Sequence, residues 1–187
     1  MVVSMIALAG CGGEDTDVDN SPDAQLAQAQ DAYHQDQFGL ALERVDRIIE
    51  QHDDFTAGYL FKARVHHQLD SADQALEAVD RAIELDAESS DAHLDRAIYL
   101  RSLDRPDRAE ASLAAAEALA LARVERGPFD IDAKLCLAMI AHLRGYVRSA
   151  LDQVNVILAD RPRSNKARAL KAMLEQEMDI ASAGSGP

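Results

Sequence analysis

A repeat of 34 residues constrains what this chain can fold into. Three units that begin at Pro22, Thr56 and Ser90 follow one another at this spacing, and a fourth unit begins at Ile131. In all four units, alanine occupies positions 8 and 20, as Ala29, Ala63, Ala97 and Ala138, and as Ala41, Ala75, Ala109 and Ala150. A fixed period of this length is typical of stacked helical hairpins.

Two further positions repeat with larger apolar side chains. Position 5 is leucine in every unit, as Leu26, Leu60, Leu94 and Leu135, and position 24 is a branched aliphatic, as Val45, Val79, Leu113 and Val154. Small alanines let two antiparallel helices approach closely, whereas the larger apolar faces need a neighbouring hairpin to cover them. The pattern therefore predicts an all-α solenoid of stacked antiparallel helix pairs. An ordinary bundle with coincidental spacing would not match four units at four positions.

Residues 22–178 resemble the tetratricopeptide repeat (TPR) family. The second unit matches best, through Tyr59, Ala63, Ala75, Ala82, Ile83 and Leu85, and the fourth keeps the turn glycine Gly145 and the closing proline Pro162. The resemblance implies a right-handed solenoid with units 22–55, 56–89, 90–130 and 131–164, a capping helix 165–178 and a disordered tail 179–187. The chain departs from the family at position 4, which is never tryptophan, and at position 7, which holds Gln28, Lys62 and Arg96.

Local signals refine these elements. The third unit is seven residues longer than the others, about two helical turns, so its second helix should run from Pro106 to about Val124 without rotating its apolar face, and protrude. Ser71 and Gln74 have the spacing of a capping box for the second helix of unit two. In the last helix, Ser164 is expected at the N-cap and Leu170, Met173 and Leu174 are expected to point inward.

The first twenty residues carry a second signal. An apolar run from Val2 to Ala9 leads into Leu8-Ala9-Gly10-Cys11, which resembles the lipobox of bacterial lipoproteins. The resemblance implies a signal peptide 1–10, a lipid on Cys11, an acidic flexible tether 11–21 and a place in the cell envelope. Gly12, in place of aspartate, is similar to the class sorted to the outer membrane, facing the periplasm.

One feature of a signal peptide is missing from this segment. Signal peptides normally begin with a positive charge, but the first basic residue is Arg44. A true start upstream of Met1 would explain the difference. A cytosolic protein with an apolar N-terminus stays open as the alternative.

Charge and motif content exclude several functions. The net charge is −14, and residues 1–122 carry 9 basic and 25 acidic side chains, a balance of −16. Nucleic-acid binding is therefore disfavoured, because it needs a positive surface. The chain has no Gly-rich phosphate loop, no Cys-x-x-Cys motif and no Gly-x-Ser-x-Gly elbow. We expect no enzyme activity and no cofactor, and we interpret Cys136 as a small buried apolar residue.

The TPR resemblance also implies a binding groove. In this family, positions 9, 12 and 13 of each first helix form a concave surface that receives an extended peptide or a partner helix. Here these positions are Gln30, Tyr33, His34, Arg64, His67, Gln68, Ile98, Arg101, Ser102, Met139, His142 and Leu143. Amides can bond a peptide backbone, and arginines suit a carboxylate.

These observations predict a membrane-anchored, non-catalytic scaffold for protein interactions. Lipoproteins with such repeats serve as secretin pilotins, pilus-assembly factors and protease adaptors, and the resemblance does not choose among them. The alternative is a lipoprotein that binds a divalent metal or a small ligand through His34, His67 and His142. A further alternative is that the groove residues form only a solvated surface.

Overall fold

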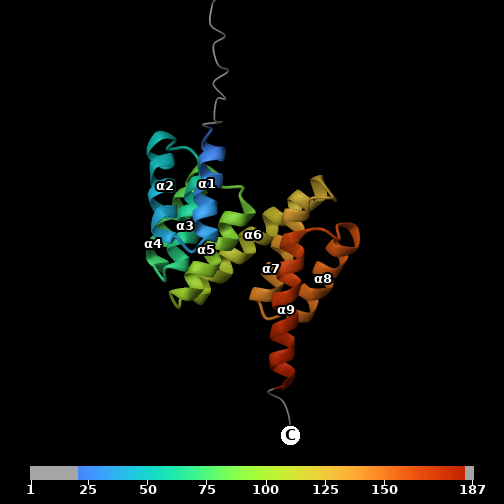
Figure 1. Cartoon of the computed structure of the whole chain (residues 1–187). Coiled ribbons are helices and arrows are strands. Elements are labelled where there is room, and N and C mark those ends of the chain that lie inside the picture. Colours follow the sequence, from blue (N-terminus) through green and yellow to red (C-terminus); the bar gives the residue numbers. More distant parts are fainter. Residues whose placement is uncertain (1–20, 184–187) are drawn as a thin grey trace, which may run out of the picture.

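The computed structural model describes residues 21–183, which form nine helices and no strand (Figure 1). The helices are α1 (Pro22–His34), α2 (Phe38–Gln51), α3 (Thr56–Gln68), α4 (Ala72–Leu85), α5 (Ser90–Ser102), α6 (Pro106–Arg126), α7 (Ile131–Leu143), α8 (Val147–Asp160) and α9 (Asn165–Ala183). Each odd-numbered helix up to α7 forms a hairpin with the helix that follows it, and successive hairpins stack side by side. The prediction of an all-α solenoid of paired helices is confirmed.

The repeated alanines lie where the helices of each hairpin meet. All eight alanines at positions 8 and 20 are buried, with at most 1% of their surface exposed. Gln74, next to the buried Ala75 on α4, is exposed. The small side chains therefore allow the close helix contacts that the 34-residue period predicted.

The apolar core is shared between hairpins. Phe61 and Val65 of α3 join the core of the first hairpin, and Cys136 and Ile140 of α7 pack with α6. A hairpin alone would expose these faces to water, so the stack is stabilised by neighbours burying them.

The long helix α6 keeps its apolar face over the extra turns. Ala109, Leu113, Ala116 and Ala120 are all buried, at spacings of four, three and four residues. The heptad spacing explains why seven additional residues do not rotate the buried face. Helix α6 is extended as predicted and runs to Arg126, and Val124 near its end packs with the α7 core.

The last helix differs from the prediction in two ways. Leu170 and Leu174 of α9 are buried against α8, but Met173 is 40% exposed because it lies at the edge of the face that Leu170 and Leu174 share. Helix α9 also continues to Ala183, so the tail predicted from residue 179 begins inside a helix. Residues 184–187 and the predicted signal peptide lie outside the described residues.

The turns inside the four hairpins share one backbone conformation. Asp36, Asp70 and Asp104 have φ values of 58°, 54° and 54°, and Gly145 has a φ of 85° at the corresponding place. In the second hairpin, the amide of Ser71 donates to the carbonyl of His66 at 2.9 Å, which closes the end of α3. A left-handed residue after the helix, followed by this bond, is the Schellman arrangement.

This turn explains why the predicted capping box of Ser71 and Gln74 is absent. The hydroxyl of Ser71 donates to the carbonyl of Leu69 at 3.3 Å and caps no amide of α4. Side-chain caps occur instead at the starts of α1, α5, α7 and α9. Ser164 accepts from the amide of Ala167 at 3.3 Å, as predicted, and Asp130 accepts from Ala133 at 2.9 Å.

Candidate functional site

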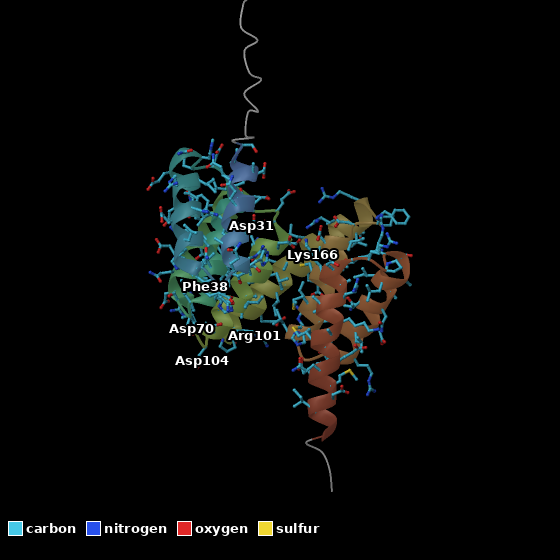
Figure 2. All side chains as sticks on the ribbon, in the orientation of Figure 1. Asp31, Phe38, Asp70, Arg101, Asp104 and Lys166 are labelled. Carbon is cyan, nitrogen blue, oxygen red and sulfur yellow. The ribbon has the colours of Figure 1, made fainter. Side chains whose placement is uncertain are left out.

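The predicted groove residues lie on the first helix of each hairpin, α1, α3, α5 and α7. Tyr33, His67, Ile98, Met139 and His142 are half-buried. The more polar members are exposed, namely Gln30, His34, Arg64, Gln68 and Arg101. Figure 2 shows Arg101 near the C-terminal end of α5 and Lys166 near the start of α9. The amides of Gln30 and Gln68 make no side-chain hydrogen bond to residues 21–183.

Aromatic contacts fix the N-terminal part of this surface. The ring of Tyr33 meets Phe38 at 5.4 Å and Phe61 at 5.8 Å between ring centroids, so it joins α1 to α2 and α3. The ring of His67 lies 5.0 Å from that of the buried Tyr99 on α5. These side chains therefore hold neighbouring first helices together as well as lining the surface.

The two predicted arginines are both engaged within the chain. Nε of Arg64 donates to Oδ2 of Asp95 at 2.9 Å, and Nη1 of Arg101 donates to the carbonyl of Leu143. Burial raises the pKa of the Asp95 carboxyl above its ordinary value, and the Arg64 guanidinium opposes that rise. Arg64 is therefore the counter-ion of a largely buried acid, and Arg101 caps the last carbonyl of α7.

His142, a predicted groove residue of α7, also has a partner. Its Nε2 lies 2.7 Å from Oε2 of Glu177 on α9. A second link between these helices joins Nζ of Lys166 to Oδ1 of Asp132 at 2.7 Å. Because Lys166 follows Asp132 by 34 residues, α9 takes the place of the first helix of a fifth unit and extends the surface, in addition to covering α8.

A pocket of about 280 Å³ opens where α3, α5, α7 and α9 meet, and we call it the central pocket. It is lined by Arg64, Asp91, Leu94, Asp132, Leu135, Cys136, Met139, Lys166 and Leu170. Only Arg64 and Met139 belong to the predicted set. The other lining residues occupy positions 2, 5 and 6 of their helices. The repeat pattern assigns the leucines at position 5 to the core and gives no role to positions 2 and 6. The aspartates repeated at position 2, Asp91 and Asp132, are the sequence feature that could have pointed to this pocket.

Cys136 borders this pocket but is buried, as interpreted from the sequence. Its Sγ donates to the carbonyl of Ser90 at 3.9 Å, and burial raises the pKa of its thiol to about 12. The thiolate is the reactive form of cysteine. Cys136 therefore contributes apolar surface here and no nucleophile.

A larger hollow of about 860 Å³ lies on the opposite side of α3. Its rim includes Lys62, paired with Asp46 at 2.6 Å, and Arg81, paired with Glu84 at 2.8 Å. The hollow is open, and its walls combine charged side chains of α2, α3 and α4 with Tyr59, Leu76 and Ala78. None of the predicted groove residues lines it, because Tyr59, Lys62 and His66 face away from Arg64 on the α3 helix.

The described residues also bear on the metal-binding and membrane hypotheses. No group of three or more His, Cys, Asp or Glu side chains there is arranged to hold a metal ion, so the metal-site alternative gains no support. Among the same residues, no helix has the length and apolarity needed to cross a bilayer.

Comparison with known proteins identifies the fold. No protein-family model matches the chain, and no curated protein matches it by sequence. A thermophilic TPR protein of Thermus thermophilus, TTC0263, superposes with a TM-score of 0.61 at 23% identity, covering 84% of this chain and 82% of that one. The second TPR of Spaghetti (RPAP3), bound to the HSP90 peptide SRMEEVD, superposes with a TM-score of 0.51 at 16% identity, covering 54% of this chain and 93% of that one. These likenesses show that the chain has the TPR fold.

Proposed function

We propose that this chain is a non-catalytic scaffold that binds an extended segment of a protein partner along its first helices. The central pocket carries this proposal, because side chains of α3, α5, α7 and α9 converge on it. Its floor is apolar and its rim is charged, the combination that gives a binding site both affinity and orientation. The exposed amides of Gln30 and Gln68 suit the backbone of an extended segment.

The structural likeness to a peptide-bound TPR supports the same function. That protein holds the HSP90 peptide SRMEEVD. In this chain, Arg64 is already paired with Asp95, and Arg101 already caps the carbonyl of Leu143. The partner of this chain therefore differs in chemistry from a ligand that is held mainly through its own carboxylates.

We further propose that a lipid on Cys11 tethers the scaffold to the cell envelope, at an outer membrane and facing the periplasm. The lipobox-like sequence Leu8-Ala9-Gly10-Cys11 supports this anchor. About ten residues separate Cys11 from the start of α1, and a flexible segment of that length has a typical end-to-end distance of roughly 17 Å. The solenoid would then stay close to the membrane surface.

Site-specific photo-cross-linking tests the scaffold function. A photoreactive amino acid replaces Met139 in the central pocket or, as the control, the exposed Val156 on α8. We expect the Met139 position to cross-link a defined partner in envelope preparations and the Val156 position to give no such product. Equal products from both positions would show that binding does not use the groove.

A separate experiment tests the anchor. Cys11→Ser removes the thiol that would carry the lipid, so the variant should remain unprocessed or move to the aqueous phase in detergent partitioning. Cys136→Ser is the matched control, because it removes the other cysteine and should leave partitioning unchanged. Membrane association that survives Cys11→Ser would contradict the lipoprotein proposal.

A further inference from the structure

We propose that the central pocket selects a lysine or arginine side chain of the bound segment. The inference rests on the proposed function, because it names the partner chemistry of the same groove. It reverses the preference suggested by the sequence, where the groove arginines pointed to a ligand carboxylate.

The size of the pocket suits one long side chain. Its volume of about 280 Å³ falls just below the roughly 300–1,000 Å³ typical of sites for whole small molecules. Leu94, Leu135, Met139 and Leu170 supply an apolar wall. Lysine and arginine bury their aliphatic stems along such walls while the charged end stays at a polar rim.

Among the acids that line the pocket, Asp91 alone has no hydrogen-bonded partner among the described residues. Arg64 is paired with Asp95 at 2.9 Å, and Lys166 is paired with Asp132 at 2.7 Å. Asp91, by contrast, makes no hydrogen bond or salt bridge with the described residues, although it lies near enough to Arg64 and Asp95 to interact with both charges. It lies in the first turn of α5, where a negative charge is favourable. Asp91 is therefore the group available to a ligand cation.

Other ligand side chains fit this arrangement less well. A carboxylate would meet the negative charges of Asp91 and Asp95, and Arg64 is already committed to Asp95. A purely apolar side chain would fill the pocket but would shield Asp91 from water without giving it a partner. The balance of −16 over residues 1–122 also attracts a cationic segment during encounter.

Selection from a random peptide library tests the inference with the full-length chain as bait. The native chain should enrich peptides with a lysine or arginine at one fixed place in the motif. The Asp91→Asn variant should lose that preference. Asp23→Asn is the matched control, because it removes the same charge from the corresponding position of α1, away from the pocket, and should enrich the same peptides as the native chain.

A synthetic pair of peptides then measures the charge contribution. One carries the enriched lysine, and the other carries norleucine, which keeps the aliphatic stem without the charge. We expect the lysine peptide to bind the native chain about tenfold more tightly, the scale of a hydrogen bond to a charged group. The two peptides should bind the Asp91→Asn variant equally.

The outcomes separate the inference from the function on which it rests. Enriched peptides that lack a basic residue, but whose binding is lost in Met139→Arg, would overturn the inference and leave the groove as the binding site. A basic preference that persists in Asp91→Asn would also overturn it. Peptides unaffected by Met139→Arg, or no enrichment at all, would overturn the groove function itself.

Discussion

The first two contacts between successive hairpins, α2–α3 and α4–α5, differ from the third, α6–α7, in the side chains that join them. At the α2–α3 contact, Lys62 pairs with Asp46 at 2.6 Å, and at the α4–α5 contact Arg96 pairs with Asp80 at 2.6 Å. Both pairs join position 7 of one unit to an acid sixteen residues earlier. The polar residues at position 7, a departure from the TPR pattern, thus serve as repeated ties between hairpins.

The third contact, between α6 and α7, replaces this ion pair with leucines. Position 7 is Leu137, and the residue sixteen places earlier is Leu121, which is 48% exposed. Arg123 provides the polar tie instead. Its Nη1 donates to the hydroxyl of the buried Ser90 at 2.9 Å, and its Nε donates to Asp130 at 3.1 Å. The comparison shows that the regular contacts use a half-buried ion pair between position 7 and the preceding hairpin, whereas the lengthened unit uses a half-buried arginine near the end of α6.

The largest expected effect comes from removing that arginine. Arg123→Ala leaves the buried Ser90 hydroxyl without its donor and leaves the Asp130 carboxylate with only the amide of Ala133, so we expect a loss of roughly 1.5–3 kcal/mol in unfolding free energy. Chemical denaturation measures it. Arg126→Ala, three residues later in the exposed last turn, is the control and should change stability by less than about 0.5 kcal/mol. Similar small losses for both variants would show that the two kinds of contact are equivalent.

The turn residues offer a second contrast between the early units and the fourth. Gly145 has a φ of 85°, and a Cβ there would meet no atom within 4 Å. A side chain at this position would therefore destabilise the fold only through backbone strain. Gly145→Ala should therefore cost about 1–2 kcal/mol. Gly145→Asp should cost less, because aspartate tolerates this conformation, as at Asp70 and Asp104. Thermal unfolding ranks the two variants, and an equal cost would contradict the explanation.

The third contact should also respond to acid. The backbone amide of Ala133 lowers the pKa of the Asp130 carboxyl below its ordinary value of 3.8, and the Arg123 guanidinium contributes a smaller lowering. Because the folded pKa is the lower one, the stabilisation is complete above the ordinary pKa and is lost as the pH falls through the folded pKa.

Asp130→Asn isolates this charge, since asparagine is also a good N-cap. The variant should be less stable than the native chain at neutral pH, by up to about 1 kcal/mol, and the difference should shrink below the ordinary pKa. Urea denaturation over a pH series measures it. A stability difference that is independent of pH would show that the Asp130 carboxylate does not stabilise this contact through its charge.

The smallest effect tests whether the seven-residue insertion preserves the register. Leu121→Asp with Leu137→Lys rebuilds at the third contact the pair seen at the first two, and a double-mutant cycle should give a coupling of about 0.2–1 kcal/mol. Ala122→Asp with Leu137→Lys is the control, because residue 122 points about 100° away on the helix, and its coupling should be near zero. Equal coupling energies for the two pairs would show that the third contact does not keep the register of the first two.

The sequence by itself determined the helices, their pairing and the buried alanines, because helix contacts require small residues at a fixed period and that period is visible in the chain. It also placed α6 correctly, since a heptad insertion keeps the apolar face in line. Tertiary structure decided what the sequence left open. Arg64 and Arg101 face the expected surface, but Asp95 and the carbonyl of Leu143, distant along the chain, engage them. The central pocket likewise exists only because α9 brings Lys166 and Leu170 beside α7, and no local pattern encodes such contacts.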